Sequence, residues 1–406
     1  MKQVVQFLKY SASVLLGLGV VALAPTGTRS AFAQVEPIQL EAHTTVVPLN
    51  PDALRRVHRA ITAPAVAGSS SSLPMWNYTI VAPKDGNTYS GTMVGGNPFF
   101  NGARTVNIPT YVVPLIIIMS DGSRFDPTVA DKCSPTLSPL QRLMGSPIFS
   151  DHSYTMNGIN MGSGQYVDEF QRANFYDTGV SMSGDSYHNP LSPVTVLPAQ
   201  TINIPSGKGA SYNLFGCENV GVVDFSTFDT IITGTLMPNL ASQGIGPGVF
   251  PLFLMYNVAL PSSGDSPSQN CCIIGYHGAL ANSLNGQIQT YAATDFDTTG
   301  YFSNVPDIAP ASHEIAEFMN DPYGTNPTPS WGHTGQVSGC QSNLEVGDPL
   351  TGVEYTSSGV TMTNGITYYP QQLAFFSWFF GQYPSIGTGG VYSDNGIFTT
   401  PAHTCQ

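Results

Sequence analysis

The stretch DIAPASHEIAEFMNDP, residues 307–322, has the clearest combined structural and chemical pattern in this 406-residue chain. Asp307 is a good N-cap residue and Asp321 stands directly before a proline, so we expect a helix between these two acids. At about 100° per residue, the apolar side chains gather on one side of that helix, and His313 and Glu317 lie together on the opposite side. The helix is therefore predicted to have a core face and a ligand face.

Glu314 is turned about 100° from His313 and can lean over the same face from its edge. The segment HEIAE resembles the HExxH helix of zinc hydrolases, where side chains at i and i+4 bind the ion and the Glu after the first His takes a proton from the attacking water. The resemblance implies that His313 and Glu317 are metal ligands and that Glu314 is the general base.

Glu317 stands where the HExxH pattern has its second histidine. A carboxylate binds Zn²⁺ at about 2.0–2.2 Å, so Glu317 can serve as a ligand in tetrahedral geometry. An additional anionic ligand makes the ion a weaker Lewis acid or favours a harder metal. The alternative interpretation is a surface pair of His313 and Glu317 at i, i+4 spacing without a metal.

A Gly-rich loop with the sequence WGHTGQVSGCQSNLEVGDP follows at 331–349 and offers the nearest further carboxylates. Glu345 lies 32 residues beyond His313 and is our predicted third ligand. Asp348 is expected to accept the other N–H of His313 and to fix its tautomer, although the two acids can exchange roles. His333 is a further candidate ligand, or alternatively a loop histidine without a site role.

Upstream, the run CCIIGYHGAL (271–280) predicts a strand that carries Tyr276 and His277. One of these side chains, with His277 as our candidate, can stabilise a tetrahedral oxyanion. The alternative is a Tyr-His pair satisfied locally at a strand end. The preceding run PLFLMYNVAL (251–260) is predicted to form the edge strand along which a peptide substrate lies.

The segment HEIAEFMNDP, followed by Trp331 and by EVGD at 345–348, resembles secreted proteins related to plant EXORDIUM, or phosphate-induced protein, and their bacterial relatives. The GYH stretch at 275–277 strengthens this resemblance, which covers roughly residues 250–350. It implies an extracellular protein with a zincin-like region. For zincins it further implies a mixed sheet with an antiparallel edge strand above the metal-binding helix.

Outside the helix segment, the chain is rich in short β-type runs separated by Gly, Pro, Asn and Asp. These runs cover 111–119, 192–205, 222–236, 249–260 and 271–280. Helix-like patterns are few, chiefly 165–176 and 308–320, and the aromatic run 367–384 is interpreted as core packing. We therefore predict an α+β fold, β-rich and turn-rich, with a zincin-like mixed sheet.

The N-terminus has the pattern of a secretory signal peptide over residues 1–33, with early lysines, an apolar run too short to span a membrane, and Ala31-Phe32-Ala33. Residues 34–74 are interpreted either as a pro-segment whose positive charges dock on the acidic body or as a flexible export spacer and linker. Residues 75–406 are predicted to form the zincin-like metallohydrolase domain.

Composition excludes several other classes of protein. Charged residues are only 10%, and 42 Gly with 32 Pro exclude a long coiled coil or a disordered acidic chain. The net charge is -13 and every Lys and Arg lies at or before Lys208, so nucleic acid and acidic membranes are unfavourable partners.

Six cysteines without CxxC spacing predict disulfides rather than a thiolate zinc site. The sulfurs of Cys271 and Cys272 are expected to point apart, as those of neighbours on a strand do.

Taken together, these patterns predict a secreted metal-dependent hydrolase, a zinc metallopeptidase acting on a peptide or protein. The alternative is a non-enzymatic extracellular or cell-wall-associated protein with a structural metal site. The zinc could also be replaced by another divalent ion. The oligomeric state stays open.

Overall fold

The computed structural model describes residues 43–47, 72–99, 105–181, 186–213, 216–262, 271–281, 287–302 and 304–405. All of these belong to one compact unit, Ile38–Gln406. The predicted signal peptide and most of 34–74, including its arginines, lie outside the described residues. Within the described part of the chain, no helix has the length and apolar character needed to cross a bilayer.

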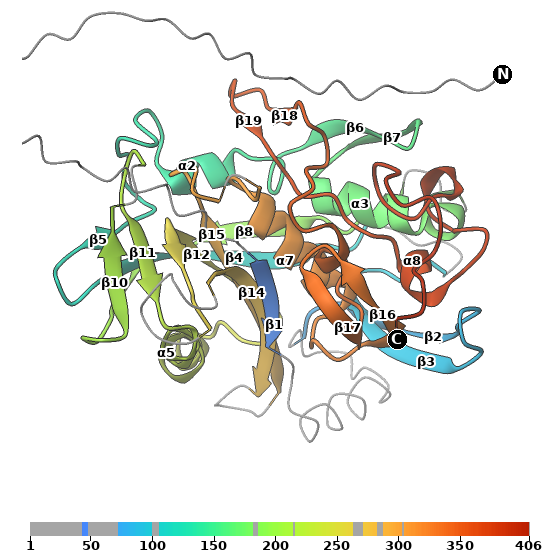
Figure 1. Cartoon of the computed structure of the whole chain (residues 1–406), viewed down its shortest axis with the longest axis horizontal. Coiled ribbons are helices and arrows are strands. Elements are labelled where there is room, and N and C mark those ends of the chain that lie inside the picture. Colours follow the sequence, from blue (N-terminus) through green and yellow to red (C-terminus); the bar gives the residue numbers. More distant parts are fainter. Residues whose placement is uncertain are drawn as a thin grey trace, which may run out of the picture. The chain divides into compact units, whose positions relative to one another are not determined.

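A mixed sheet organises the fold and places α7 (Ala309–Asn320) against two of its strands (Figure 1). In spatial order the strands are β1 (His43–Val47), β14 (Ile273–Ala281), β15 (Ile288–Phe296), β12 (Phe250–Tyr256), β4 (Ile108–Ile118) and β5 (Arg124–Phe125), and β8 (Leu191–Val196) and β9 (Gln200–Asn203) also pair with β4. Strands β4, β12 and β15 run parallel, β14 runs antiparallel to β15, and β1 runs parallel to β14. The predicted α+β, strand-rich class is confirmed.

The remaining elements are small sheets and short helices around this sheet. The small sheets are β2 (Met75–Val81) with β3 (Thr88–Val94), β6 (His152–Met156) with β7 (Ile159–Gly164), β10 (Gly209–Tyr212) with β11 (Val220–Val223) and β13 (Val258–Ala259), β16 (Pro327–Thr334) with β17 (Val337–Asn343), and β18 (Val360–Thr361) with β19 (Thr367–Tyr368). The helical elements are α2 (Pro139–Met144), α3 (Tyr166–Asn174), η1 (Tyr176–Val180), α5 (Phe225–Ile231), η3 (Ile232–Leu236), α6 (Met237–Ser242), α7, η4 (Asp348–Leu350), α8 (Phe376–Phe380) and η5 (Thr388–Gly390).

Strand β12 lies inside the sheet, so the prediction that this run forms a peptide-binding edge is wrong. It pairs with β4 on one side and β15 on the other, and all seven of its residues are buried. Phe250 and Leu252 pack into one apolar cluster, whereas Phe253 and Met255 pack into another. A continuous apolar run is typical of a strand covered on both faces, which an edge position does not provide.

The predicted strand over 222–236 is also wrong beyond its first residues. Strand β11 ends at Val223, and helix α5 begins one residue after Asp224. The Asp224 carboxylate accepts a hydrogen bond from the Thr227 amide at 2.9 Å, which is an N-cap contact. This cap starts a helix in a segment whose many β-branched residues favour a strand by propensity alone.

Helix α7 lies within the predicted limits, but its N-cap residue is Ile308 rather than Asp307. The backbone of Asp307 has a positive φ of 38°, and its carboxylate accepts hydrogen bonds from the amides of Ile308 and, at 3.1 Å, Tyr369. Asp307 therefore ties the helix start to a distant loop.

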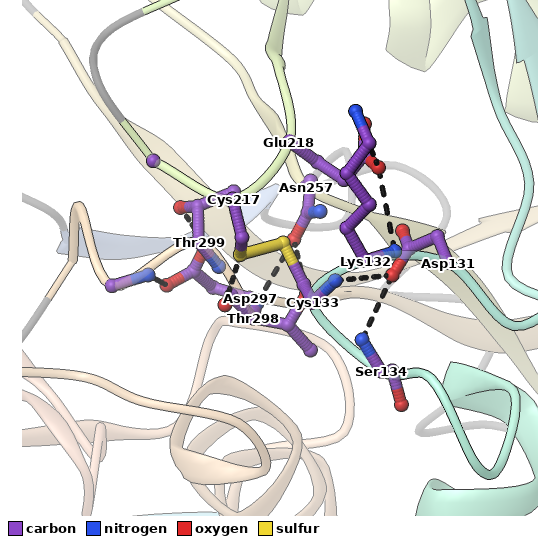
Figure 2. Close-up of a disulfide and its surroundings, with 12 residues drawn as sticks. Asp131, Lys132, Cys133, Ser134, Cys217, Glu218, Asn257, Asp297, Thr298 and Thr299 are labelled. Carbon is purple, nitrogen blue, oxygen red and sulfur yellow. Dashed lines mark hydrogen bonds and ion pairs between the residues drawn. A yellow bond between two sulfur atoms is a disulfide. The ribbon is translucent and has the colours of Figure 1, made fainter.

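Three disulfides join the six cysteines: Cys133–Cys217, Cys271–Cys272 and Cys340–Cys405. Figure 2 shows the first of them, beside the ion pair of Lys132 with Glu218 at 3.8 Å. The adjacent cysteines bond to each other, so our expectation that their sulfurs point apart is wrong. Both precede β14, which begins at Ile273, and the side-chain alternation of a strand does not apply to them.

Candidate metal centre

Helix α7 carries the predicted ligand residues into the interior, because all twelve of its residues are buried. It packs against β14 and β15, and this contact places the helix next to His277 of β14. The Nδ1 atom of His277 lies 3.1 Å from Oε2 of Glu314 and 3.7 Å from Oε2 of Glu317. Two segments far apart in the sequence thus share one buried site.

Glu317 is at the centre of this group. Its Oε1 lies 2.9 Å from Nε2 of His313, one helical turn earlier. The same oxygen accepts hydrogen bonds from the amides of Gly347 and Asp348, at 3.1 and 3.2 Å, where η4 begins. The main chain of the loop therefore fixes one carboxylate oxygen of Glu317, while the other faces His277.

The downstream loop contributes the two acids that the sequence singled out. Glu345 Oε2 lies 3.9 Å from Nε2 of His277, and Asp348 Oδ1 lies 3.5 Å from Nε2 of His313. Amide side chains from β17 and the turn before it hold both acids: Asn343 donates to Glu345 at 2.7 Å, Gln341 donates to Asp348 at 2.7 Å, and Gln336 also donates to Asp348.

One ring nitrogen of each histidine lies beside an oxygen atom that does not belong to these carboxylates. His313 Nδ1 lies 3.1 Å from Oε1 of Gln371, and His277 Nε2 lies 3.1 Å from the main-chain oxygen of Asp321. Such contacts fix the tautomer of a metal-binding imidazole. We expected Asp348 in this role for His313, but Asp348 faces the same nitrogen as Glu317, and Gln371 occupies the opposite side.

Burial and charge shift the protonation of the whole group. Burial lowers the pKa of His277 to about 3, so this ring is neutral. For His313, burial opposes the charged ring, but the charges of Glu317 and Glu314 and the hydrogen bonds to Glu317 and Asp348 together outweigh it and raise the pKa of His313 well above the usual value. Burial also raises the pKa values of the carboxyls of Glu314, Glu317 and Glu345.

The site holds more acids than bases. Among the described residues, no Lys or Arg forms an ion pair with Glu314, Glu317 or Glu345. Oε1 of Glu314 and Oε2 of Glu345 are buried without a hydrogen-bond partner in the described part of the chain. A buried carboxylate without a partner is costly, and a cation is the group that satisfies it.

Within this site, two sets of side chains have ligand atoms close enough to hold an ion. In each set the ligand atoms lie within 4.8 Å of one another, and Glu317 belongs to both. The sets are His277, Glu317 and Glu345, and His313, Glu314 and Glu317.

A pocket of about 380 Å³ reaches the acidic side of the group. Glu317, Glu345 and Asp348 line its inner end, and Thr45 of β1 and residues of β17 line its walls. Solvent and a substrate group can therefore approach these carboxylates, and neither His277 nor His313 lines the pocket.

The structure brings together all six residues proposed from the sequence, namely His277, Glu314, His313, Glu317, Glu345 and Asp348. It does not bring His333 to them: this residue is exposed and lies beside the disulfide Cys340–Cys405. Sequence analysis missed Gln371, which stands in an aromatic run 58 residues from His313 and carries no local signal of a site role.

We expect Gln371→Ala to weaken metal binding by about 10–100-fold, because the His313 ring loses the oxygen that orients it. A competition titration against a chromogenic chelator measures this change. Gln382→Ala is a suitable control, since its side chain contacts Ser377 rather than a histidine of the site. Equal metal affinity in the wild type and Gln371→Ala would show that Gln371 does not support metal binding.

Gly347→Ala is expected to disturb the site by steric contact alone. A Cβ at position 347 would come within 2.5 Å of the His313 ring, whereas a Cβ at Gly339, on the wall of the same pocket, meets nothing within 4 Å. Metal affinity should therefore fall in Gly347→Ala and stay at the wild-type value in Gly339→Ala. Equal affinities in the two variants would show that the ring does not need its present position.

Comparisons with protein-family models, with curated proteins and with solved structures gave no match to this chain.

Proposed function

We propose that this chain is a secreted, metal-dependent hydrolase of the metallopeptidase type, with zinc or another divalent ion at the α7 site. One observation carries the proposal: two buried histidines meet three buried glutamates without a lysine or arginine partner in the described part of the chain, next to an accessible pocket. Three disulfides support the proposed export, because such bonds persist in oxidising compartments.

The proposed ligands are Glu317 and His313 from the helix, together with His277 and Glu345. Glu317 belongs to both sets of ligand atoms, so it is the one residue that every arrangement of the ion uses. Gln371 and Asp321 hold the two histidine rings. A bound divalent ion would supply the positive charge that polarises a substrate carbonyl and promotes ionisation of water.

Glu314 is the proposed general base. Its Oε1 is buried without a hydrogen-bond partner among the described residues, and burial raises the pKa of its carboxyl. In the proposed reaction Glu314 takes a proton from water, the oxygen of that water bonds to the substrate carbonyl carbon, and the proton passes to the leaving amine as the carbon–nitrogen bond breaks.

The fold supports a zincin-like assignment and the proposed relationship to EXORDIUM-type proteins. The sheet is mixed, and β14 runs antiparallel to β15 where α7 packs. The strand that carries His277 thus lies beside the helix that carries the HEIAE segment, but β1 covers its outer side, where the resemblance implies an edge strand.

Metal analysis of the purified protein, combined with a peptide-library cleavage assay with and without a chelator, tests this proposal. We expect about one divalent ion per chain and cleavage that the chelator abolishes and added zinc restores. Bound metal without cleavage of any peptide would favour the structural metal site of a non-enzymatic extracellular protein. Absence of both would reject the metal centre.

A further inference from the structure

Strand β1 is the outermost strand of the central sheet, and its neighbour is β14, the strand that carries His277. It pairs in parallel with β14, and Thr45 stands opposite Tyr276 while Val46 stands opposite His277. No other strand of the described chain pairs with β1, which comes from the 34–74 region rather than from the body of the fold. The edge that β1 covers would otherwise expose unpaired main-chain groups of β14.

Strand β1 also packs against helix α7, which carries the proposed general base Glu314. Glu314 itself lies against the neighbouring strand β14 at Gly275, where a Cβ would come within 2.9 Å of its side chain. Strand β1 therefore lies beside the helix of the site as well as along the edge of the sheet.

Thr45 is in addition one of the residues that line the pocket leading to Glu317, Glu345 and Asp348. The other lining residues include Gln341 and Asn343 of β17. An extended segment at the position of β1 thus lies along one wall of the pocket that a substrate has to enter.

The connection from β1 to the next strand is long. Residues 48–74 separate Val47 from β2, which begins at Met75. A connection of these 27 residues spans at most roughly 90 Å when extended. Departure of β1 from the sheet therefore places no strain on β2.

We propose that the outer edge of β14 is a binding edge for an extended peptide and that residues 43–47 occupy it as an internal competitor of the substrate. This inference rests on the proposed function in one respect, namely that the substrate is a peptide. Strand addition gives affinity through main-chain hydrogen bonds, which any extended peptide can make. The pro-segment interpretation of 34–74 acquires a physical basis from this pairing.

Full-length Thr45→Pro, compared with full-length Thr45→Ser, tests the pairing. Proline removes the Thr45 N–H and disfavours the strand, whereas serine keeps both. Hydrogen exchange of the β14 amides at 275–278 should become faster by on the order of 10-fold in Thr45→Pro and stay unchanged in Thr45→Ser. A fluorescent peptide with the sequence of residues 40–50 should bind Thr45→Pro at least about 10-fold more tightly than the wild type, because the edge is vacant more often.

A second design avoids dependence on a folded proline variant. A specific protease recognition sequence is inserted between Ser70 and Ser71 of the full chain, which is folded first and then cleaved. After cleavage and gel filtration, the labelled peptide should bind at least about 10-fold more tightly than before cleavage. Unchanged peptide affinity in both designs, with unchanged exchange of the β14 amides, would overturn the inference.

Hydrolysis measured on the same samples separates this inference from the proposed function. Tighter peptide binding without cleavage in the presence of zinc would reject the hydrolase and retain the binding edge. Cleavage at the same rate by the wild type and Thr45→Pro, with equal peptide affinity, would retain the hydrolase and reject internal competition.

Discussion

Substituting Glu314 by Gln is expected to lower kcat for peptide hydrolysis by on the order of 10²–10⁴-fold while the metal ion stays bound. Glutamine cannot accept the proton of the attacking water, but it has the same shape as glutamate. Its amide can donate to Nδ1 of the neutral His277 ring, which lies 3.1 Å from the Glu314 carboxylate. The local packing against β14 should therefore persist.

Metal content, thermal stability and turnover of Glu314→Gln are measured together. Glu218→Gln is the matched control, because Glu218 pairs with Lys132 beside the Cys133–Cys217 disulfide and has no contact with the site. Turnover at the wild-type rate in Glu314→Gln would exclude Glu314 as the base. Loss of the ion in this variant would instead make Glu314 a ligand, as the His313, Glu314 and Glu317 set allows.

The second large effect is expected for Glu317→Gln, which removes the charge of the one carboxylate that both ligand sets share. The loss of metal affinity should exceed the roughly 10–100-fold loss expected when a residue that only orients a ligand is changed. A ligand at a thousand times its Kd raises the free energy of unfolding by about 4 kcal/mol. Zinc at that concentration should stabilise the wild type by this amount and Glu317→Gln by less than about 1.4 kcal/mol, which is the stabilisation that remains after a 100-fold loss of affinity.

Thermal unfolding with and without zinc gives this result independently of any activity. Glu218→Gln again serves as the control and should show the full stabilisation. Equal stabilisation of Glu317→Gln and the wild type would contradict the proposed centre, because both ligand sets at α7 contain Glu317.

Local sequence patterns predicted the elements whose signal lies within one segment. The limits of α7 were correct to within about two residues, and the apolar runs at 111–119 and 271–280 lie in or beside strands β4 and β14. The aromatic run 367–384 packs largely in the core as expected, with Phe375 and Phe379 fully buried. These predictions succeeded because the helical period, the apolar content and the aromatic content of a segment can each be recognised from a few neighbouring residues.

The errors arose where a single contact or a neighbouring strand overrides the local pattern. The Asp224 cap turns the β-branched run 222–236 into a helix after Val223. The run around 251–260 is apolar enough for a strand, but only the pairing with β4 and β15 shows that it lies inside the sheet. The disulfide between Cys271 and Cys272 was likewise missed, because we applied the alternation of side chains along a strand to two residues that precede the strand.

The amino-acid sequence by itself determined that His313, Glu314 and Glu317 stand together, because four residues make about one turn of any α-helix. Tertiary structure alone decided that His277, Glu345 and Gln371 join them and that β1 covers the edge beside them. Those contacts depend on strand order and on the path of loops. Neither can be predicted from a local sequence pattern, and both follow from how the whole chain buries its apolar clusters.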